Sequence, residues 1–594
     1  MPKKPFSGKQ KKLQLASKRE RKRDGSSIYS DDVDSGDQHS AREDGDGTSG
    51  NSLRLAKVNQ QPVGPGIGTK YDPNRYRLHF HRESKEELQK RKQASFEPIQ
   101  PVGEDDLEMD LQKIYRPGTV LDMPIRPSWN YSMTKNELDA REENFFHQYV
   151  ENIFKAHQNS DDLSYFELNL ETWRQLWRVI EMSDVLFVIV DLRFPILHFP
   201  PTLYQYISQV IKKPMILILN KIDFVPAELA VAWKKYFEET YLNLNVVLFG
   251  SSPRAAVNFR ETFKKKKPIK RKNQVCFGDK DIFRICEQLT DGKVDLSEWK
   301  ERVFHQENPT QTQKAGSKAV PTATSSAVDR LHPLDYQQFK DGVLTIGCIG
   351  EPNVGKSSVI NALMGQKVVS VSRTPGHTKH FQTIFLARNV KLCDSPGLVF
   401  PATAPKVLQI LGGIYPISQV QDPVSVIGYL AARVPLVELL NIKHPDGSRN
   451  KGQFSAMDIC EAWAIKRGFM TAKAARPDTY RAANHLLRVT LEGKIIFRMY
   501  PPAYVQARTW YEKLPETKDL KSTLQRLEAQ LTRVEGQVEE ETEEESEDEE
   551  SDVDADREEV GEEGSEEEEE EEEEEAGRAA VSSNPFAGLD EVTD

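Results

Sequence analysis

The chain has 594 residues, of which 29% are charged and 38% are hydrophobic, and its formal charge is −12. This length allows two to four domains, and the high charge excludes one compact globule. Residues 535–575 contain 28 acidic side chains and one arginine, a charge of −27, which leaves +15 on the rest of the chain. A basic body of this kind attracts polyanions such as nucleic acid.

The cysteines and the apolar segments indicate the kind of compartment. Neither paired nor metal-ligand spacing relates the five cysteines, which fits free thiols in a reducing environment: Cys276, Cys286, Cys348, Cys393 and Cys460. No apolar run approaches ~18 residues, so no membrane span is expected. The N-terminus lacks the apolar core of a secretory signal. We therefore expect a cytosolic or nuclear protein.

Both ends of the chain are predicted to be disordered. Residues 1–52 begin with a basic arm and then turn acidic and glycine-rich, and residues 535–594 form an acidic tail. Such compositions bury too little apolar surface to fold. Residues 53–165 mix short apolar clusters with loops, and we assign no fold to this N-terminal extension.

A regular alternation of helices and buried strands begins near residue 166 and continues to residue 302. Apolar runs predict strands at 185–190, 214–220 and 245–250, and helical spacing predicts helices at 170–182, 202–213, 227–241 and 280–289. Buried strands that alternate with amphipathic helices are typical of a parallel-rich sheet with helices on both faces. This segment is therefore expected to be the first half of an α/β domain.

The alternation stops in a polar linker, residues 303–335, and resumes in a second half, residues 336–404. The second half has strands expected at 343–350, 380–387 and 390–394, with a helix at 356–365. Residues 405–515 are expected to form a mainly helical domain, with helices at 424–440, 456–468 and 479–493, and a last helix candidate at 516–534. The chain thus predicts one α/β domain in two pieces and a helical domain after it.

A phosphate-binding loop joins the first strand of the second half to its helix. Gly350-x4-Gly355-Lys356-Ser357 is the pattern in which backbone N–H groups surround phosphate oxygens. Lys356 is expected to reach the β- and γ-phosphates, the Ser357 hydroxyl to bind Mg²⁺, and the helix start to attract anions. The remaining expected contacts to the nucleotide are Glu351, Pro352, Asn353, Val354 and Ser358.

The strand at 390–394 runs into the tetrapeptide Asp394-Ser395-Pro396-Gly397, a DxxG pattern. Asp394 is expected to hold Mg²⁺ through water, and the Gly397 N–H to sense the γ-phosphate. The pattern alone is common. Its place at a strand end after the phosphate loop supports the assignment.

The stretch SRTPGHTKHFQ lies between these two motifs and suits a first switch segment. Such a segment needs a hydroxyl that reaches Mg²⁺ in the triphosphate state. We expect Thr378 to supply it, with Thr374 as the alternative. A plain Pro-Gly surface turn would also account for this stretch.

The stretch LILNKID is a buried strand that ends in Asn220-Lys221-Ile222-Asp223. An ionised Asp223 can accept from the N1–H and the exocyclic amine of guanine, and adenine lacks this pair of donors. A site built on such a match discriminates strongly, because the wrong base leaves polar groups unpaired. Asn220 is expected to brace the loop and the Lys221 stem to cover the base. If the match were accidental, the phosphate loop would serve an ATPase.

The next strand ends in FGSS, residues 249–252, which suits a backbone clasp on the base. Ser251 and Ser252 are the candidates for this clasp. All parts of a guanine-nucleotide site are then present at strand ends, where open α/β sheets bind ligands. Their order along the chain is unusual, because the base reader and the clasp precede the phosphate loop.

This order resembles that of the circularly permuted GTPases, and the resemblance covers roughly residues 120–505. The stretches RPSWNYSMTKNELDARE and ETWRQLWRVIEMSDVLFVIVDLRFP are similar to the eukaryotic branch that includes the large-subunit GTPases and nucleostemin. Residues 191–195 match the family's Asp-Ala-Arg-x-Pro element, with Leu192 in the alanine position.

The resemblance implies a GTP-hydrolysing switch that uses Mg²⁺. Leu398 stands where Ras-like proteins have the glutamine that orients the attacking water, so hydrolysis is expected to be slow. Asn353 occupies a position that helps to hold K⁺ in similar loops, so K⁺ stimulation is expected. The expected catalytic set is Lys356, Thr378, Gly397 and Asn353. Because the helical domain follows the DxxG motif, it is expected to report the nucleotide state.

The charged segments suggest partners. The basic segments 3–23 and 264–272 suit nuclear import or contact with pre-ribosomal RNA or ribosomal proteins, although solvated lysines without a partner are an alternative. Ser546, Ser551 and Ser565 in the acidic tail suit an acid-directed kinase. We expect a protein of the nucleus, nucleolus and cytoplasm that acts in ribosome assembly. The alternative is a GTP-dependent interaction or signalling switch with no ribosomal role.

Overall fold

The computed structural model describes residues 78, 80–81, 85–130, 132–157, 163–251, 276–304, 337–372, 375–376, 378, 381–445, 447, 453–471 and 475–529. Several predictions of the sequence analysis fall outside these residues: those for the two chain ends, most of the linker 303–335, the basic segments 3–23 and 264–272, Ser252, Thr374, and the serines Ser546, Ser551 and Ser565.

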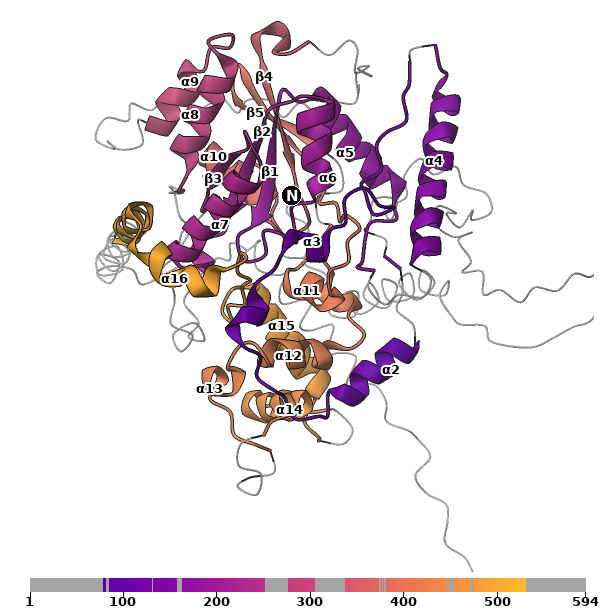
Figure 1. Cartoon of the computed structure of the whole chain (residues 1–594), viewed down its shortest axis with the longest axis vertical. Coiled ribbons are helices and arrows are strands. Elements are labelled where there is room, and N and C mark those ends of the chain that lie inside the picture. The colour runs from indigo at the N-terminus through magenta and orange to yellow at the C-terminus, as the bar shows by residue number, and fades with distance from the viewer. Residues whose placement is uncertain are drawn as a thin grey trace, which may run out of the picture. The chain divides into compact units, whose positions relative to one another are not determined.

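Six strands form one sheet in the order β3-β2-β1-β4-β6-β5 (Figure 1). The strands are β1 (Val185–Asp191), β2 (Met215–Asn220), β3 (Asn245–Leu248), β4 (Leu344–Ile349), β5 (Gln382–Ala387) and β6 (Val390–Asp394). All neighbouring pairs are parallel except β5 with β6. A two-residue connection joins β5 to β6, and so short a link only allows an antiparallel pair. The mostly parallel sheet expected from the sequence is confirmed, with one antiparallel edge strand.

The two halves of the α/β domain meet in the middle of this sheet. The first half supplies β1, β2 and β3, and the second half supplies β4, β5 and β6. Parallel pairing of β1 with β4 joins them, with Val185 opposite Ile346 and Val188 opposite Ile349. The carboxyl ends of β2, β1 and β4 therefore lie at the same sheet edge, which is where open α/β sheets bind ligands.

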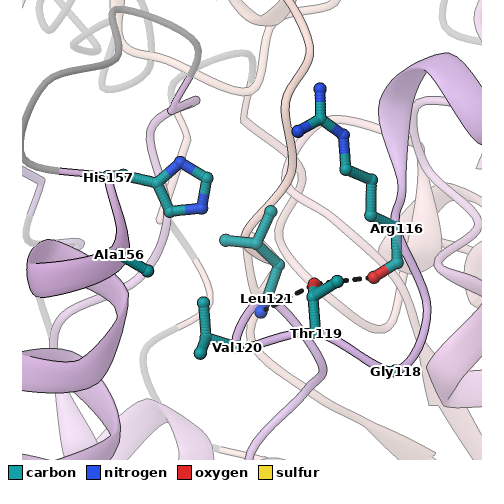
Figure 2. Close-up of a pocket in the computed structure, with 7 residues that line it drawn as sticks. All are labelled: Arg116, Gly118, Thr119, Val120, Leu121, Ala156 and His157. Carbon is teal, nitrogen blue, oxygen red and sulfur yellow. Dashed lines mark hydrogen bonds between the residues drawn. The ribbon is translucent and has the colours of Figure 1, made fainter.

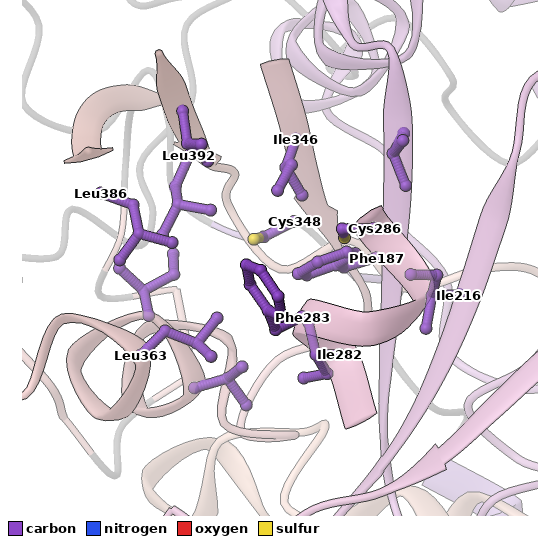
Figure 3. Close-up of a cluster of buried hydrophobic side chains, with 14 of the residues drawn as sticks. Phe187, Ile216, Ile282, Phe283, Cys286, Ile346, Cys348, Leu363, Leu386 and Leu392 are labelled. Carbon is purple, nitrogen blue, oxygen red and sulfur yellow. The ribbon is translucent and has the colours of Figure 1, made fainter. Parts of the chain in front are cut away.

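One sheet face packs against α8 (Asp279–Thr290), α9 (Ser297–Phe304) and α10 (Lys356–Met364) (Figure 1). Figure 3 shows the apolar cluster between them, in which side chains of strands from both halves meet those of the helices. Phe187 of β1 and Ile346 of β4 contribute from the sheet, and Phe283 of α8 and Leu363 of α10 from the helices. The core thus holds the two halves together as one unit.

The opposite face is covered by α5 (Leu170–Met182), which packs on β4. Gly347 of β4 lies so close to α5 that an added Cβ would collide with Ser183 and approach Val179 and Leu186 to 2.9 Å. Further along, α6 (Pro201–Tyr204) continues into a π-helical segment, Gln205–Val210, and α7 (Ala227–Thr240) packs by β3. The expected helix at 202–213 is therefore shorter and partly π-helical.

The N-terminal extension had no fold assigned from its sequence, and its described residues contain two α-helices that are longer than one turn. These are α2 (Lys85–Ala94) and α4 (Lys135–Ala156), with η2 (Glu104–Leu107) and α3 (Leu111–Ile114) between them. The α4 helix starts with a capping box made by Thr134 and Glu137. Its buried Glu142 accepts from Arg126 at 2.8 Å and from Arg174 of α5 at 2.7 Å. These ion pairs attach α4 to the α/β domain.

The helical segment after β6 contains α11 (Lys406–Leu411), η9 (Ile417–Gln419), α12 (Pro423–Ala431), α13 (Leu436–Leu440), α14 (Ala456–Arg467), α15 (Thr479–Leu491) and α16 (Tyr504–Lys513). The single helix expected at 424–440 is two helices, because Pro435 cannot donate to a continuing helix. Helices α12, α14 and α15 pack together, and α16 packs on α7. A further helix covers residues 515–529.

The state of the cysteines and the length of the helices also bear on the sequence predictions. All five cysteines are free thiols. Within the described ranges, every helix is too short or too polar to cross a membrane.

The close approach of Gly347 to α5 predicts a measurable stability effect. Gly347→Ala should lower the free energy of unfolding by about 1–3 kcal/mol, because an extra methyl overpacks the core. Gly103→Ala is the matched control, since a Cβ at Gly103 meets nothing within 4 Å. Denaturant titration of both variants measures the difference, and equal unfolding midpoints would contradict the tight packing of β4 on α5.

Candidate nucleotide-binding site

The phosphate loop connects β4 to α10 and is curled by two left-handed residues. Asn353 has φ of 58° and Gly355 has φ of 97°, and Gly355 is the N-cap of α10. An added Cβ on Gly355 would collide with the side-chain nitrogen of Asn220. Glycine is therefore required here both by the backbone conformation and by the close neighbour.

Lys356 extends across this loop from the first turn of α10. Its ammonium donates to the carbonyl oxygens of Gly350 at 3.1 Å and Glu351 at 2.8 Å. Burial lowers the pKa of Lys356 to about 8, although Asp394 and Glu351 act in the opposite direction. A cation held in this way inside a loop suits the binding of phosphate oxygens.

Ser357 and Asp394 meet at the start of α10 and the end of β6. The Ser357 hydroxyl donates to Oδ2 of Asp394 at 3.0 Å. The other oxygen, Oδ1, is buried and accepts no hydrogen bond within the described part of the chain. Burial raises the pKa of this carboxyl, and Lys356 counteracts the increase. A hydroxyl beside an incompletely satisfied carboxylate fits a hard divalent cation such as Mg²⁺.

The described residues contain no cluster of three or more His, Cys, Asp or Glu side chains that could hold a metal by themselves. Ser357 and Asp394 offer two oxygen atoms, and Mg²⁺ is usually bound by one or two protein ligands together with water and phosphate.

The Asn220–Asp223 tetrapeptide, the predicted base reader, contacts the phosphate loop directly. Asn220, the last residue of β2, donates to the Val354 carbonyl at 2.8 Å. Lys221 adopts the left-handed conformation, and its ammonium donates to the Asn353 carbonyl at 2.6 Å and to Asp191 at 2.7 Å. Two motifs that are far apart in the sequence are thus joined by direct hydrogen bonds.

Asp223 follows in the short helix η4 (Ile222–Phe224) and is half-buried. Burial is the largest influence on its carboxyl and raises the pKa, whereas Lys221 lowers it. The Ile222 N–H donates to the Phe249 carbonyl at 3.2 Å. This bond places the base-reading loop beside the end of β3, where Ser251 is partly buried.

The DxxG motif packs against the other side of the phosphate loop. Ser395 donates to the Cys348 carbonyl at 2.7 Å, and the Leu398 N–H donates to the Gly350 carbonyl at 3.3 Å. A Cβ on Gly397 would approach the Pro352 nitrogen to 2.6 Å. Pro396 is buried, and the Leu398 side chain is only 2% exposed.

Four further residues predicted for the site lie around these motifs. Thr378 is half-buried and lies in the stretch before β5, in which 375–376 and 378 are described. The Asn353 side-chain nitrogen donates to the Gly413 carbonyl at 2.8 Å, so this residue connects the phosphate loop to the helical segment. Glu351 is buried and Ser358 is partly buried at the start of α10.

Sequence reasoning missed two buried groups of polar side chains at this edge. Asp191, the last residue of β1, accepts from Arg193 and Lys221, each at 2.7 Å. Burial disfavours the charged carboxyl, but the two cations hold the pKa of Asp191 well below its ordinary value. The DLRFP element contains both Asp191 and Arg193, so it carried a local sequence signal for their pairing.

The second pair joins the β1 loop to the phosphate loop. Glu351 contacts Nδ1 of His198 at 2.7 Å, and both side chains are buried. Burial raises the pKa of Glu351, and His198 opposes this increase. No local pattern could have revealed the pair, because the two residues come from different halves of the domain.

A separate cavity of about 530 Å³ lies between the loop at 116–121 and the end of α4 (Figure 2). Figure 2 shows Thr119 within the loop, where its hydroxyl donates to the Arg116 carbonyl at 2.7 Å. The cavity contains none of the motif residues, and we assign no nucleotide to it.

Comparison with known proteins finds related GTPases. Residues 345–420 match the family model described as 50S ribosome-binding GTPase. Guanine nucleotide-binding protein-like 1 of Mus musculus is 46% identical over 539 residues, which span 87% of this chain and 88% of the mouse protein. Large subunit GTPase 1 of Saccharomyces cerevisiae is 33% identical over 403 residues, 66% of this chain and 59% of the yeast protein.

Among solved structures, a GNP-bound YlqF from T. maritima covers 56% of this chain and 97% of its own, with 17% identity and a TM-score of 0.31. So low a score carries no argument about this chain. The family assignment rests instead on the 46% identity to the mouse protein and on the order of the motifs along the chain. The chain belongs to the circularly permuted GTPase family that includes guanine nucleotide-binding protein-like 1.

Proposed function

We propose that the protein is a guanine-nucleotide switch that hydrolyses GTP slowly and acts in ribosome assembly. The observation that carries the proposal is the pair of hydrogen bonds from Asn220 and Lys221 to the phosphate loop. They join the predicted base reader directly to the predicted phosphate loop, which supports a single nucleotide site built from both motifs. Family membership supports GTP hydrolysis in general, and the finer statements below are our inference.

The residues take their roles from their positions at the sheet edge. Lys356 and the loop N–H groups bind the phosphates, and Asp223 accepts from the guanine edge, flanked by Ile222 and by Ser251 and Ser252. Ser357 and Asp394 hold Mg²⁺, with Thr378 joining them in the triphosphate state. When bound, Mg²⁺ neutralises charge on the β- and γ-phosphate oxygens. Gly397 provides the backbone N–H that senses the γ-phosphate.

Slow hydrolysis follows from Leu398. Its apolar side chain is buried and cannot orient a water molecule by hydrogen bonding. In a site without that group, positive charge beside the phosphates becomes the main source of rate enhancement. We infer that Asn353 helps to hold K⁺ when its side chain exchanges the contact with the Gly413 carbonyl for the ion.

A role on the ribosome is supported by the relatives and by charge. The family model is named for 50S ribosome binding, and the yeast relative is named as a large-subunit GTPase. Segments 3–23 and 264–272 would contact pre-ribosomal RNA or ribosomal proteins, and the nucleus, nucleolus and cytoplasm are the matching locations. An acid-directed kinase acting on Ser546, Ser551 and Ser565 would add charge to the tail.

The second candidate is a GTP-dependent interaction or signalling switch with no ribosomal role. The Asn353–Gly413 contact favours it equally, because it links the nucleotide site to a helical segment that could bind any partner.

Asp223→Asn tests guanine selectivity. The variant should bind GTP roughly ten- to a hundredfold more weakly, because one charge-assisted hydrogen bond contributes about 1.5–3 kcal/mol. ATP binding should not change. Competition of GTP and ATP against a fluorescent GDP measures both affinities. Asp281→Asn, which changes an exposed side chain of α8, is the control. A wild-type chain that binds both bases equally would exclude the guanine assignment.

Replacing K⁺ by Na⁺ at constant ionic strength tests the cation. GTP turnover should fall by about tenfold, which corresponds to ~1.4 kcal/mol of transition-state stabilisation. Asn353→Ala should remove the K⁺ dependence, whereas Asn353→Asp, which keeps a side-chain oxygen, should retain it. Identical turnover of the wild type in the two salts would rule out the potassium site.

Sedimentation with ribosomal particles separates the two functions. With a non-hydrolysable GTP analogue, the wild type should migrate with 60S or pre-ribosomal particles. Lys356→Ala should stay near the top of the gradient, because it cannot retain the nucleotide. Absence of the wild type from 40S, 60S and pre-ribosomal fractions would favour the interaction switch.

A further inference from the structure

We propose that Asp191 and Arg193 are positioning residues for the guanine reader, the loop of residues 220–223. Through them, recognition of the base depends on the contact between this loop and the helical segment. The inference rests on the proposed binding of guanine at Asp223. It concerns residues for which neither the sequence motifs nor the relatives' names give a role.

Asp191 holds the reader from the end of β1. Its carboxylate accepts from the Arg193 backbone N–H at 3.0 Å, from the Arg193 guanidinium at 2.7 Å and from Lys221 at 2.7 Å. Lys221 is left-handed, with φ of 65°, and stands two residues before Asp223. An ammonium anchored at Asp191 and at the Asn353 carbonyl therefore fixes both the turn and the stem that covers the base.

Arg193 carries the connection to the helical segment. Its guanidinium donates to the Thr490 carbonyl at 3.3 Å, near the end of α15, and its own carbonyl accepts from the Met499 N–H at 2.9 Å. The same guanidinium lies 5.1 Å from the ring centre of Phe224. Because Arg193 is only 1% exposed, loss of the helical contact would leave a buried donor without its partner.

Gly493 touches the reader from the other side. It follows α15, has φ of 75°, and a Cβ added there would collide with the ring of Phe224. Phe224 is the residue after Asp223. The end of α15 and the residues after it thus reach the reader's surroundings at two points: Thr490 bonds Arg193, and Gly493 lies against Phe224.

Two contacts from one helix end give a physical route for coupling. Coupling between two sites is reciprocal, so a shift of α15 that weakens guanine binding implies that bound guanine stabilises α15. The phosphates bind in a different loop, and a change confined to the reader should leave their contribution intact. A reduced preference for GTP over ATP is therefore the specific sign of this coupling.

The experiment uses the full chain with Gly493→Ala and its matched control Gly468→Ala. Gly468 also follows a helix in the helical segment and has φ of 70°, but a Cβ there meets nothing within 4 Å. Both variants share the backbone strain, and only Gly493→Ala pushes on Phe224. Competition of GTP and ATP against a fluorescent GDP gives the GTP-to-ATP affinity ratio for each chain.

We expect Gly493→Ala to lower this ratio by about two- to thirty-fold, the range found for residues that couple distant sites. Gly468→Ala should keep the wild-type ratio. Arg193→Lys retains the charge beside Asp191 but is too short for Thr490, and it should lower the ratio as well. Hydrogen exchange in residues 479–491 should slow on GDP binding in the wild type and less in Gly493→Ala.

Equal ratios for the wild type, Gly493→Ala and Arg193→Lys would overturn the inference, even if the variants were less stable. So would equal losses in Gly493→Ala and Gly468→Ala. A wild-type chain with no preference for GTP would instead overturn the proposed function, and this inference with it.

Discussion

The parallel pairing of β1 with β4 is the constraint on which the rest of the structure depends. It joins strands from the two halves of the domain, with Val188 opposite Ile349. A slip of one residue would move the strand ends by about 3.3 Å and turn every side chain of the slipped strand to the opposite face. The 2.6 Å contact between Lys221 and the Asn353 carbonyl could not survive such a shift. Register in the sheet therefore determines whether a nucleotide site exists.

Buried charges make that register specific. Asp191 and Arg193 are almost completely buried, and taking such groups out of water costs several kcal/mol unless they are paired with good geometry. Asp191 and Arg193 pair locally, but the Lys221 ammonium reaches both Asp191 and the Asn353 carbonyl only when β1, residues 220–223 and the phosphate loop come together. These buried charges exclude other arrangements of the three segments. The apolar cluster around Phe187 and Ile346 supplies the free energy of folding.

Local patterns predicted the strands and motifs well, because each lies within a few residues of chain. The LILNKID and GEPNVGKS stretches indicated both loops and their strand ends. Local patterns did not predict the antiparallel direction of β5, the break at Pro435 or the fold of the extension. The pairs of Asp191 with Lys221 and of His198 with Glu351 were also missed. They join segments 30 and 153 residues apart, and such distant pairing leaves no periodic signal in a single sequence.

The N-terminal extension constrains how the DxxG motif, the proposed second switch, can move. Residues 399–405 connect the DxxG motif to α11, and the extension holds this connector. The Ser164 hydroxyl donates to the carbonyls of Ala402 and Ala404, and the Thr403 N–H donates to the Ile114 carbonyl at 2.8 Å. A displacement of Leu398 cannot simply pull on a loose linker, because its neighbours are buried and bonded on both sides. A displacement that passes from the DxxG motif along this connector would therefore move the extension as well.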